Sequence, residues 1–106
     1  NTGIGLAMIA AAKGYQAVFT HPTSISDEKI ETMRMLGAET VECPSVSILN
    51  SQHYYHAAVQ IAAERKNAVA VKQFENTASA LSHYQTTGPE ILQQTNRHVD
   101  GFVCSA

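Results

Sequence analysis

The first residues of the chain, Asn1-Thr2-Gly3-Ile4-Gly5, form a polar, glycine-bearing segment that leads directly into small apolar residues typical of a helix. The first N–H groups of a helix lack intrahelical partners, and the helix dipole places partial positive charge there, so a carboxylate or phosphate can bind. Asn1 and Thr2 add side-chain donors, and glycines let a ligand or another backbone come close. On these residues alone, an anion site and a simple capped helix start both stay open.

Further polar residues follow the expected strands. Thr20 and His21 come after the first strand, and Gln73 and Phe74 come after the third. Ligands of open α/β sheets bind at the carboxyl ends of the strands. Gln73 is therefore either a donor to the same small anion as Asn1 or a loop residue satisfied by backbone groups.

Two other kinds of site are disfavoured by the residues that should complete them. A dinucleotide fingerprint begins with Gly3-x-Gly5, but Met8 stands where its third glycine should be, and no acidic residue ends the following strand. His53 and His56 are spaced like metal ligands, yet no third ligand lies nearby in the sequence. We interpret this pair as an exposed or half-buried helix start and predict no metal site.

The remaining histidines and cysteines do not form a catalytic arrangement. His21 and His83 stand alone, and we interpret both as structural. Cys43 and Cys104 are too few for a disulfide framework, which indicates structural thiols in a reducing compartment. We therefore assign no catalytic residue within the chain and expect a cytoplasmic protein, with an organelle as the alternative.

Periodicity predicts alternating helices and strands. A helix is expected over residues 4–13, and a second from Ser24–Ser26 to Gly37, in which Ile30, Met33 and Leu36 form an apolar stripe at helical spacing. A third is expected over His53–Arg65 with Tyr55, Ala58, Ile61 and Ala62 inward. A weak helix is expected over Asn76–Tyr84, and another after a Thr87-x-x-Glu90 capping box. Strands are expected at Tyr15–Thr20, stopped by His21-Pro22, and at Glu39–Cys43, Val69–Gln73 and Gly101–Cys104. This order predicts one α/β domain over residues 1–106, a Rossmann-like three-layer αβα sandwich with a roughly four-stranded parallel sheet.

The amino-acid composition limits the classes of partner that the chain could bind. The chain has 106 residues, 44% hydrophobic and 15% charged, with a net charge of −2. These values predict one compact domain and disfavour nucleic acid or an anionic membrane as the main partner. No apolar run reaches the roughly 18 residues of a membrane span, and no targeting signal is visible. A start at Asn-Thr without Met suggests a piece of a longer protein.

The segments together resemble the cysteine synthase and cystathionine β-synthase family of fold-type II pyridoxal-phosphate enzymes. The matching stretches occur in the family's order and span essentially the whole chain. They are Asn1 to Ala7, Lys13-Gly14-Tyr15, Pro22 with Ser26-x-Glu28-Lys29, Leu36 to Glu39, Gln73-Phe74-x-Asn76, and His83-x-x-Thr86-Thr87-Gly88-Pro89-Glu90-Ile91.

The resemblance implies roles for three residues. In the family, the loop matched by Asn1 and Thr2 binds the α-carboxylate of the amino-acid substrate, and its Asn also hydrogen-bonds the 3′ oxygen of pyridoxal 5′-phosphate. The family's Gln before Phe completes that carboxylate site, which assigns the role to Gln73. The Schiff-base lysine would lie upstream of Asn1, and the glycine-rich phosphate loop would follow Ala106. The chain would then be the smaller domain of a two-domain enzyme, inactive alone.

The implied reaction is β-replacement on an O-activated serine to form cysteine, carried out by a transferase or lyase that is commonly a homodimer. Thr77, Ser79 and Ala80 depart from the usual cysteine synthase pattern. Cystathionine β-synthase or serine/threonine dehydratase activity therefore stays open, as does a non-catalytic α/β relative that binds a small molecule.

Overall fold

The computed structural model describes residues 1–104, and these group into two compact units, residues 1–70 and 71–104. The helices are α1 (Thr2–Lys13), α2 (Asp27–Met35), α3 (Tyr54–Glu64), α4 (Ala78–Gln85) and α5 (Thr87–Gln94), and the strands are β1 (Val18–Pro22) and β2 (Glu39–Cys43). The first unit holds α1 to α3 and both strands, and the second holds α4 and α5. The prediction of a single domain over residues 1–106 stays a prediction.

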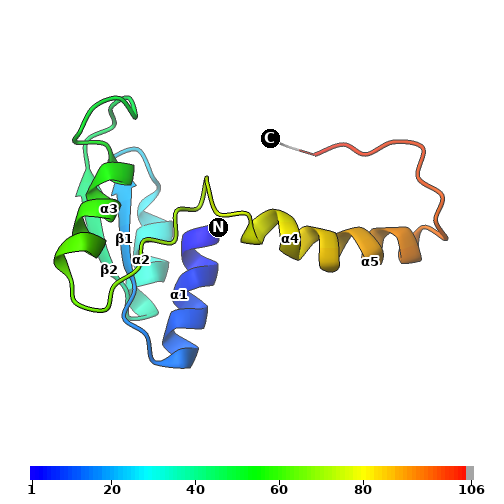
Figure 1. Ribbon diagram of the computed structural model, residues 1–106, viewed down its shortest axis with the longest axis horizontal. Coiled ribbons are helices and arrows are strands. Elements are labelled where there is room, and N and C mark those ends of the chain that lie inside the picture. Colours follow the sequence, from blue (N-terminus) through cyan, green and yellow to red (C-terminus); the bar gives the residue numbers. More distant parts are fainter. Residues whose placement is uncertain (105–106) are drawn as a thin grey trace. The chain divides into compact units, whose positions relative to one another are not determined.

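The first unit is built in three layers, as expected for an α/β sandwich. β1 and β2 pair in parallel, with Val18 opposite Glu39 and Pro22 opposite Cys43. Successive side chains of a strand point to opposite faces. Phe19 packs on the core cluster that α1 and α2 cover, whereas Thr20 donates a 2.8 Å hydrogen bond to the carbonyl oxygen of Tyr54 in α3. The helices therefore cover both faces of the sheet (Figure 1).

The core of this unit is small and centres on Ala7, Met33 and Ala38. Ile4, Ala17, Phe19 and Leu36 pack against it. In α2, Ile30 and Met33 are buried as their helical spacing predicts, whereas the predicted inner face of α3 is only half-buried. The apolar stripe of α2 thus holds α1 and the sheet together.

The predicted helix ends and the second strand agree closely with the structure. Gly14 follows α1 in the left-handed conformation with φ 73°, and Gly37 follows α2 with φ 85°, a region in which glycine is favoured. β2 matches its predicted bounds, and α3 is one residue shorter at each end because His53 and Arg65 are its caps.

The first strand differs from its prediction. β1 begins at Val18 rather than Tyr15 and continues through His21 and Pro22, which we expected to stop it. The ladder persists because the proline is the last residue of the strand, where a missing N–H is tolerated, and Thr23 N–H then donates to the Cys43 carbonyl oxygen at 3.1 Å.

The roughly four-stranded sheet is a correction, since the described residues form a sheet of two strands. Val69–Gln73 is not a strand. Val69 is 84% exposed, and Lys72 has φ 52°, which extended backbone cannot adopt. The amides of Glu75 and Asn76 then donate to the Lys72 carbonyl oxygen and close a turn. Gly101–Cys104 is also irregular, because a strand needs a neighbour to pair with.

The capping box at Thr87-x-x-Glu90 is a second correction. Thr86 is the N-cap of α5 and makes no side-chain cap hydrogen bond. Thr87 is already helical, and its hydroxyl lies 2.9 Å from Nδ1 of His83 in α4. The preceding helix α4 places a partner for Thr87 that the local sequence pattern could not reveal.

Candidate functional site

The candidate anion site is the start of α1. Asn1 is the N-cap residue, its side chain is exposed, and it makes no cap hydrogen bond. Its carbonyl oxygen accepts from Gly5 N–H at 3.0 Å, so the amides of Thr2, Gly3 and Ile4 precede the first hydrogen bond of the helix. With an exposed Thr2 beside it, this end of α1 offers backbone and side-chain donors to an anion.

Gly3 serves the packing beneath this end of the helix. A Cβ at Gly3 would lie 2.9 Å from Sδ of Met33 and 3.7 Å from Cδ1 of Phe19, whereas a Cβ at Gly5 would meet no described atom within 4 Å. The close approach at Gly3 is therefore to α2 and β1. Of the two roles that the sequence left open for this glycine, the structure supports contact with another part of the chain.

Gln73 lies in the second unit, whereas Asn1 and Thr2 lie in the first. It is exposed in the turn after Lys72, and its side chain makes no hydrogen bond to a described residue. The structure therefore gives no support to the alternative that backbone groups satisfy the Gln73 amide.

The other residues at the end of β1 are occupied within the fold. The Thr20 hydroxyl donates to α3, and His21 is 4% exposed beneath α2. A site shared by the strand ends and the start of α1 would need Thr20 or His21 beside Asn1 and Thr2. Neither residue takes part in such a site.

His53 and His56 have structural partners at the start of α3, as expected of a helix start, although His53 is buried rather than exposed or half-buried. Nδ1 of His53 accepts from Tyr55 N–H at 3.2 Å and so caps α3. Nε2 of His56 lies 2.7 Å from the Ile48 carbonyl oxygen. Within residues 1–104, no group of three or more His, Cys, Asp or Glu side chains is arranged to hold a metal ion.

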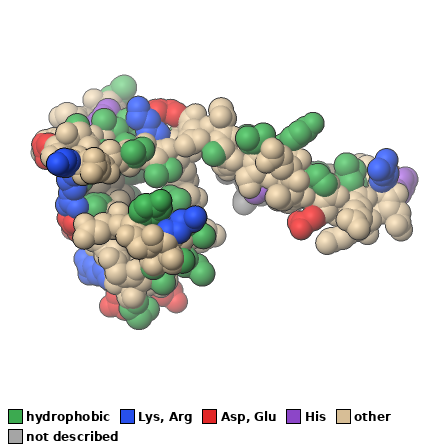
Figure 2. Space-filling view, turned by 60° about the horizontal axis from the view of Figure 1, so that its bottom comes forward, with side chains coloured by type: hydrophobic (Ala, Val, Ile, Leu, Met, Phe, Trp, Pro, Cys, Tyr) green, Lys and Arg blue, Asp and Glu red, His purple; other side chains and the backbone are tan. Residues whose placement is uncertain are grey.

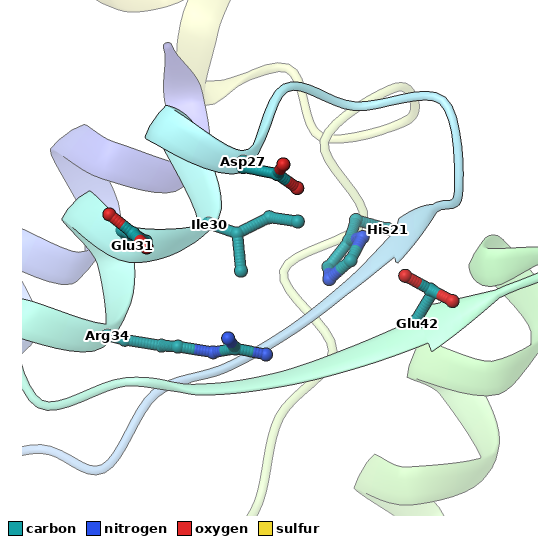
Figure 3. Close-up of a pocket in the computed structure, with 6 residues that line it drawn as sticks. All are labelled: His21, Asp27, Ile30, Glu31, Arg34 and Glu42. Atoms are coloured by element: carbon teal, nitrogen blue, oxygen red, sulfur yellow. The ribbon is translucent and has the colours of Figure 1, made fainter.

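A polar pocket of about 210 Å³ lies between α2 and the ends of the two strands (Figure 3). It is lined by His21, Asp27, Ile30, Glu31, Arg34 and Glu42. Sequence reasoning missed it, although its signal was present: the α2 residues recur at helical spacing, and His21 stands at the carboxyl end of a strand. The pocket also depends on the register of β1 and β2, which places His21 opposite Glu42.

Both cysteines are free thiols, as expected. Burial raises the pKa of the Cys43 thiol above its ordinary value, and the neighbouring Glu42 carboxylate raises this pKa further. Cys104 is exposed. Among the helices that the structure describes, none has the length and apolar character needed to cross a membrane.

Comparison with known proteins identifies close relatives over almost the whole chain. The chain is 46% identical over 105 residues to cysteine synthase 1 of Emericella nidulans. This match covers 99% of the chain and 28% of the relative. It is 40% identical over 107 residues to cystathionine beta-synthase of Oryctolagus cuniculus, covering 100% of this chain and 19% of the relative. The chain thus spans less than a third of the length of the relatives it matches.

Solved structures and family models agree with these matches. A hydrogen sulfide-producing enzyme from Fusobacterium nucleatum aligns with a TM-score of 0.80 and 33% identity, covering 93% of this chain and 32% of that one. The family model described as pyridoxal-phosphate dependent enzyme matches residues 1–106. The resemblance read from the sequence is confirmed, and the chain belongs to the pyridoxal-phosphate dependent enzyme family.

Proposed function

We propose that the protein containing this chain catalyses β-replacement on an O-activated serine to form cysteine, and that this chain supplies the substrate carboxylate-binding loop. The observation that carries the proposal is the start of α1, where Asn1 occupies the N-cap position without using its side chain as a cap. The 46% identity to a cysteine synthase supports the choice of reaction.

The residues of this chain would bind and orient. Backbone amides of the first turn of α1, the Thr2 hydroxyl and the Gln73 amide are neutral donors suited to a substrate carboxylate. The Asn1 amide can donate both to that carboxylate and to an oxygen of pyridoxal 5′-phosphate. When bound, the cofactor supplies the electron sink for the reaction. The chain's own contribution is to hold the substrate in a reactive geometry and to help exclude water.

The test uses single-turnover kinetics of the full-length enzyme with O-acetylserine. Asn1→Ala and Gln73→Ala should each slow the first chemical step about tenfold or more, because each removes a donor to a charged group. Lys66→Ala, a change at an exposed residue after α3, is the matched control. Unchanged rates in both variants would show that this loop does not bind the carboxylate.

Cystathionine synthesis is the second candidate, since cystathionine beta-synthases match the chain at 40% identity. Both reactions would use the same carboxylate-binding residues, and they differ in the nucleophile. Product analysis with sulfide and with homocysteine separates them. Cysteine as the dominant product supports the first proposal, and cystathionine supports the second.

We also propose that the intact protein is a homodimer in the cytoplasm and that residues 1–106 alone are inactive. The two free cysteines suit a reducing compartment. The chain also covers only 28% of the cysteine synthase it matches. Light scattering of the full-length protein tests the dimer, and an activity assay of residues 1–106 tests their inactivity.

A further inference from the structure

The pocket beneath α2 contains none of the residues proposed to bind the substrate carboxylate. One face of α2 contributes Asp27, Ile30, Glu31 and Arg34, and the strands contribute the register partners His21 and Glu42. Figure 3 shows the His21 ring directed from β1 toward Ile30 and Arg34. Exposed acidic side chains and a buried imidazole thus line one half-open pocket.

His21 has an unused acceptor in this pocket. Its Nδ1 lies 3.1 Å from the Pro22 carbonyl oxygen, which can only accept, so Nδ1 carries the proton. In the neutral ring, Nε2 is then an acceptor. Nε2 exposes less than 1 Å² and has no hydrogen-bond partner among the described residues, although His21 is 4% exposed. Because buried polar atoms are nearly always paired, this atom indicates a donor that the described residues do not supply.

The charges around the pocket favour a positively charged donor. Asp27, Glu31 and Glu42 contribute three carboxylates, and none forms an ion pair with a described residue. Arg34 is the single cationic side chain of the lining, and its Nε already donates to Oγ1 of Thr40 at 2.8 Å. The lining thus holds three carboxylates against one guanidinium, so its field attracts a cation.

We propose that this pocket binds a small primary alkylammonium ion. The carboxylates hold its charge, Nε2 of His21 accepts one of its N–H groups, and Ile30 contacts its alkyl carbon. A metal ion is disfavoured because no described group of three His, Cys, Asp or Glu side chains is arranged to ligate one. Because Nε2 exposes less than 1 Å², the lining must shift for the ligand to reach it. The proposal does not depend on the β-replacement activity.

The experiment observes the ring signals of His21 by NMR in the full-length protein labelled with ¹³C-histidine. Methylammonium chloride is titrated in at constant ionic strength, and the signal is assigned with His21→Gln. We expect a saturable shift of His21 and no shift of His83, whose Nδ1 is already paired with Thr87. Cofactor absorbance is followed in the same samples, so that reaction of the amine with the cofactor is recognised separately.

Two comparisons decide the outcome. Tetramethylammonium carries the same charge without an N–H donor and should not reproduce the shift; an equal shift, or no saturable shift with methylammonium, overturns the proposal. Glu42→Gln and Asp27→Asn should weaken binding about threefold to tenfold. Glu28→Gln, on the same helix but outside the lining, should leave it unchanged. If Glu28→Gln weakened methylammonium binding equally, the effect would come from the net charge of the protein rather than from this pocket, and the proposal would be contradicted.

Discussion

At the scale of single residues, the start of α1 combines two demands on neighbouring positions. Asn1 and Thr2 are exposed and present donors, whereas Gly3 lies against the buried side chain of Met33. A side chain at position 3 would hold α1 away from α2, because its Cβ would lie 2.9 Å from Met33 Sδ. The proposed binding loop and the core are therefore linked through one glycine.

Replacing the two glycines of α1 with alanine should have opposite effects on stability. Alanine favours a helix over glycine by roughly 0.5–1 kcal/mol, so Gly5→Ala, in open space, should stabilise by about that amount. Gly3→Ala places a Cβ 2.9 Å from Met33 Sδ, and overpacking should outweigh this gain and destabilise by about 1 kcal/mol net. Urea unfolding of the full-length protein measures both changes, and a stabilising Gly3→Ala would contradict the packing role.

The raised pKa of Cys43 predicts a loss of stability in alkaline solution. A thiol with a raised folded-state pKa binds its proton more tightly in the folded protein than in the unfolded one. Its contribution is constant below the ordinary thiol pKa of 9.0 and falls as the pH rises above it. Unfolding free energies from pH 7 to 10 should therefore decline less steeply in Cys43→Ala than in the parent protein. Identical slopes would show that burial does not perturb this thiol.

At the scale of secondary structure, the helices of the two units differ in what supports them. α1 and α2 contribute Ala7 and Met33 to a buried cluster that Ala38 completes, whereas no described residue of 71–104 is buried. Phe74, Leu81, Tyr84 and Phe102 are instead largely exposed, and Figure 2 shows hydrophobic side chains on the molecular surface. Helices of eight residues have little stability without tertiary packing.

A synthetic peptide of residues 71–106 should accordingly be mostly unfolded in water. Its circular dichroism should show a small helical signal, because α4 and α5 lack a buried core. A cooperative thermal transition of this peptide would mean that the second unit folds by itself. The peptide with Thr87→Val serves as a comparison, since it removes the hydroxyl beside His83.

At the scale of the whole molecule, this chain covers 28% of the cysteine synthase it matches and 32% of the matched solved structure. The family depends on pyridoxal phosphate. In this chain, Asn1 is the one residue that we assign to cofactor binding. Most of the groups that hold the cofactor are therefore expected elsewhere in the intact protein.

The full-length protein should retain the visible absorbance of bound pyridoxal phosphate after gel filtration. Residues 1–106 incubated with the cofactor should lose this absorbance on gel filtration. The start of one helix and one side-chain amide bind the cofactor too weakly for the complex to survive dilution. Bovine serum albumin treated in the same way controls for non-specific capture by surface lysines. Retention by residues 1–106 above that control would contradict the assignment of the cofactor site to the rest of the protein.

The sequence alone determined the local features and the family. Gly14 and Gly37 end helices, the Ile30 and Met33 stripe is buried, and the ordered motifs identify pyridoxal-phosphate chemistry, because each depends on neighbouring residues or on a recognisable order. Tertiary structure decided what depends on distant partners. Val69–Gln73 lacks a strand to pair with, Thr87 is bonded to His83 in the preceding helix, and Gly3 faces Met33. The register that places His21 opposite Glu42 created a pocket that no local pattern could reveal, since hydrogen bonds and contacts between distant residues exist only in the folded chain.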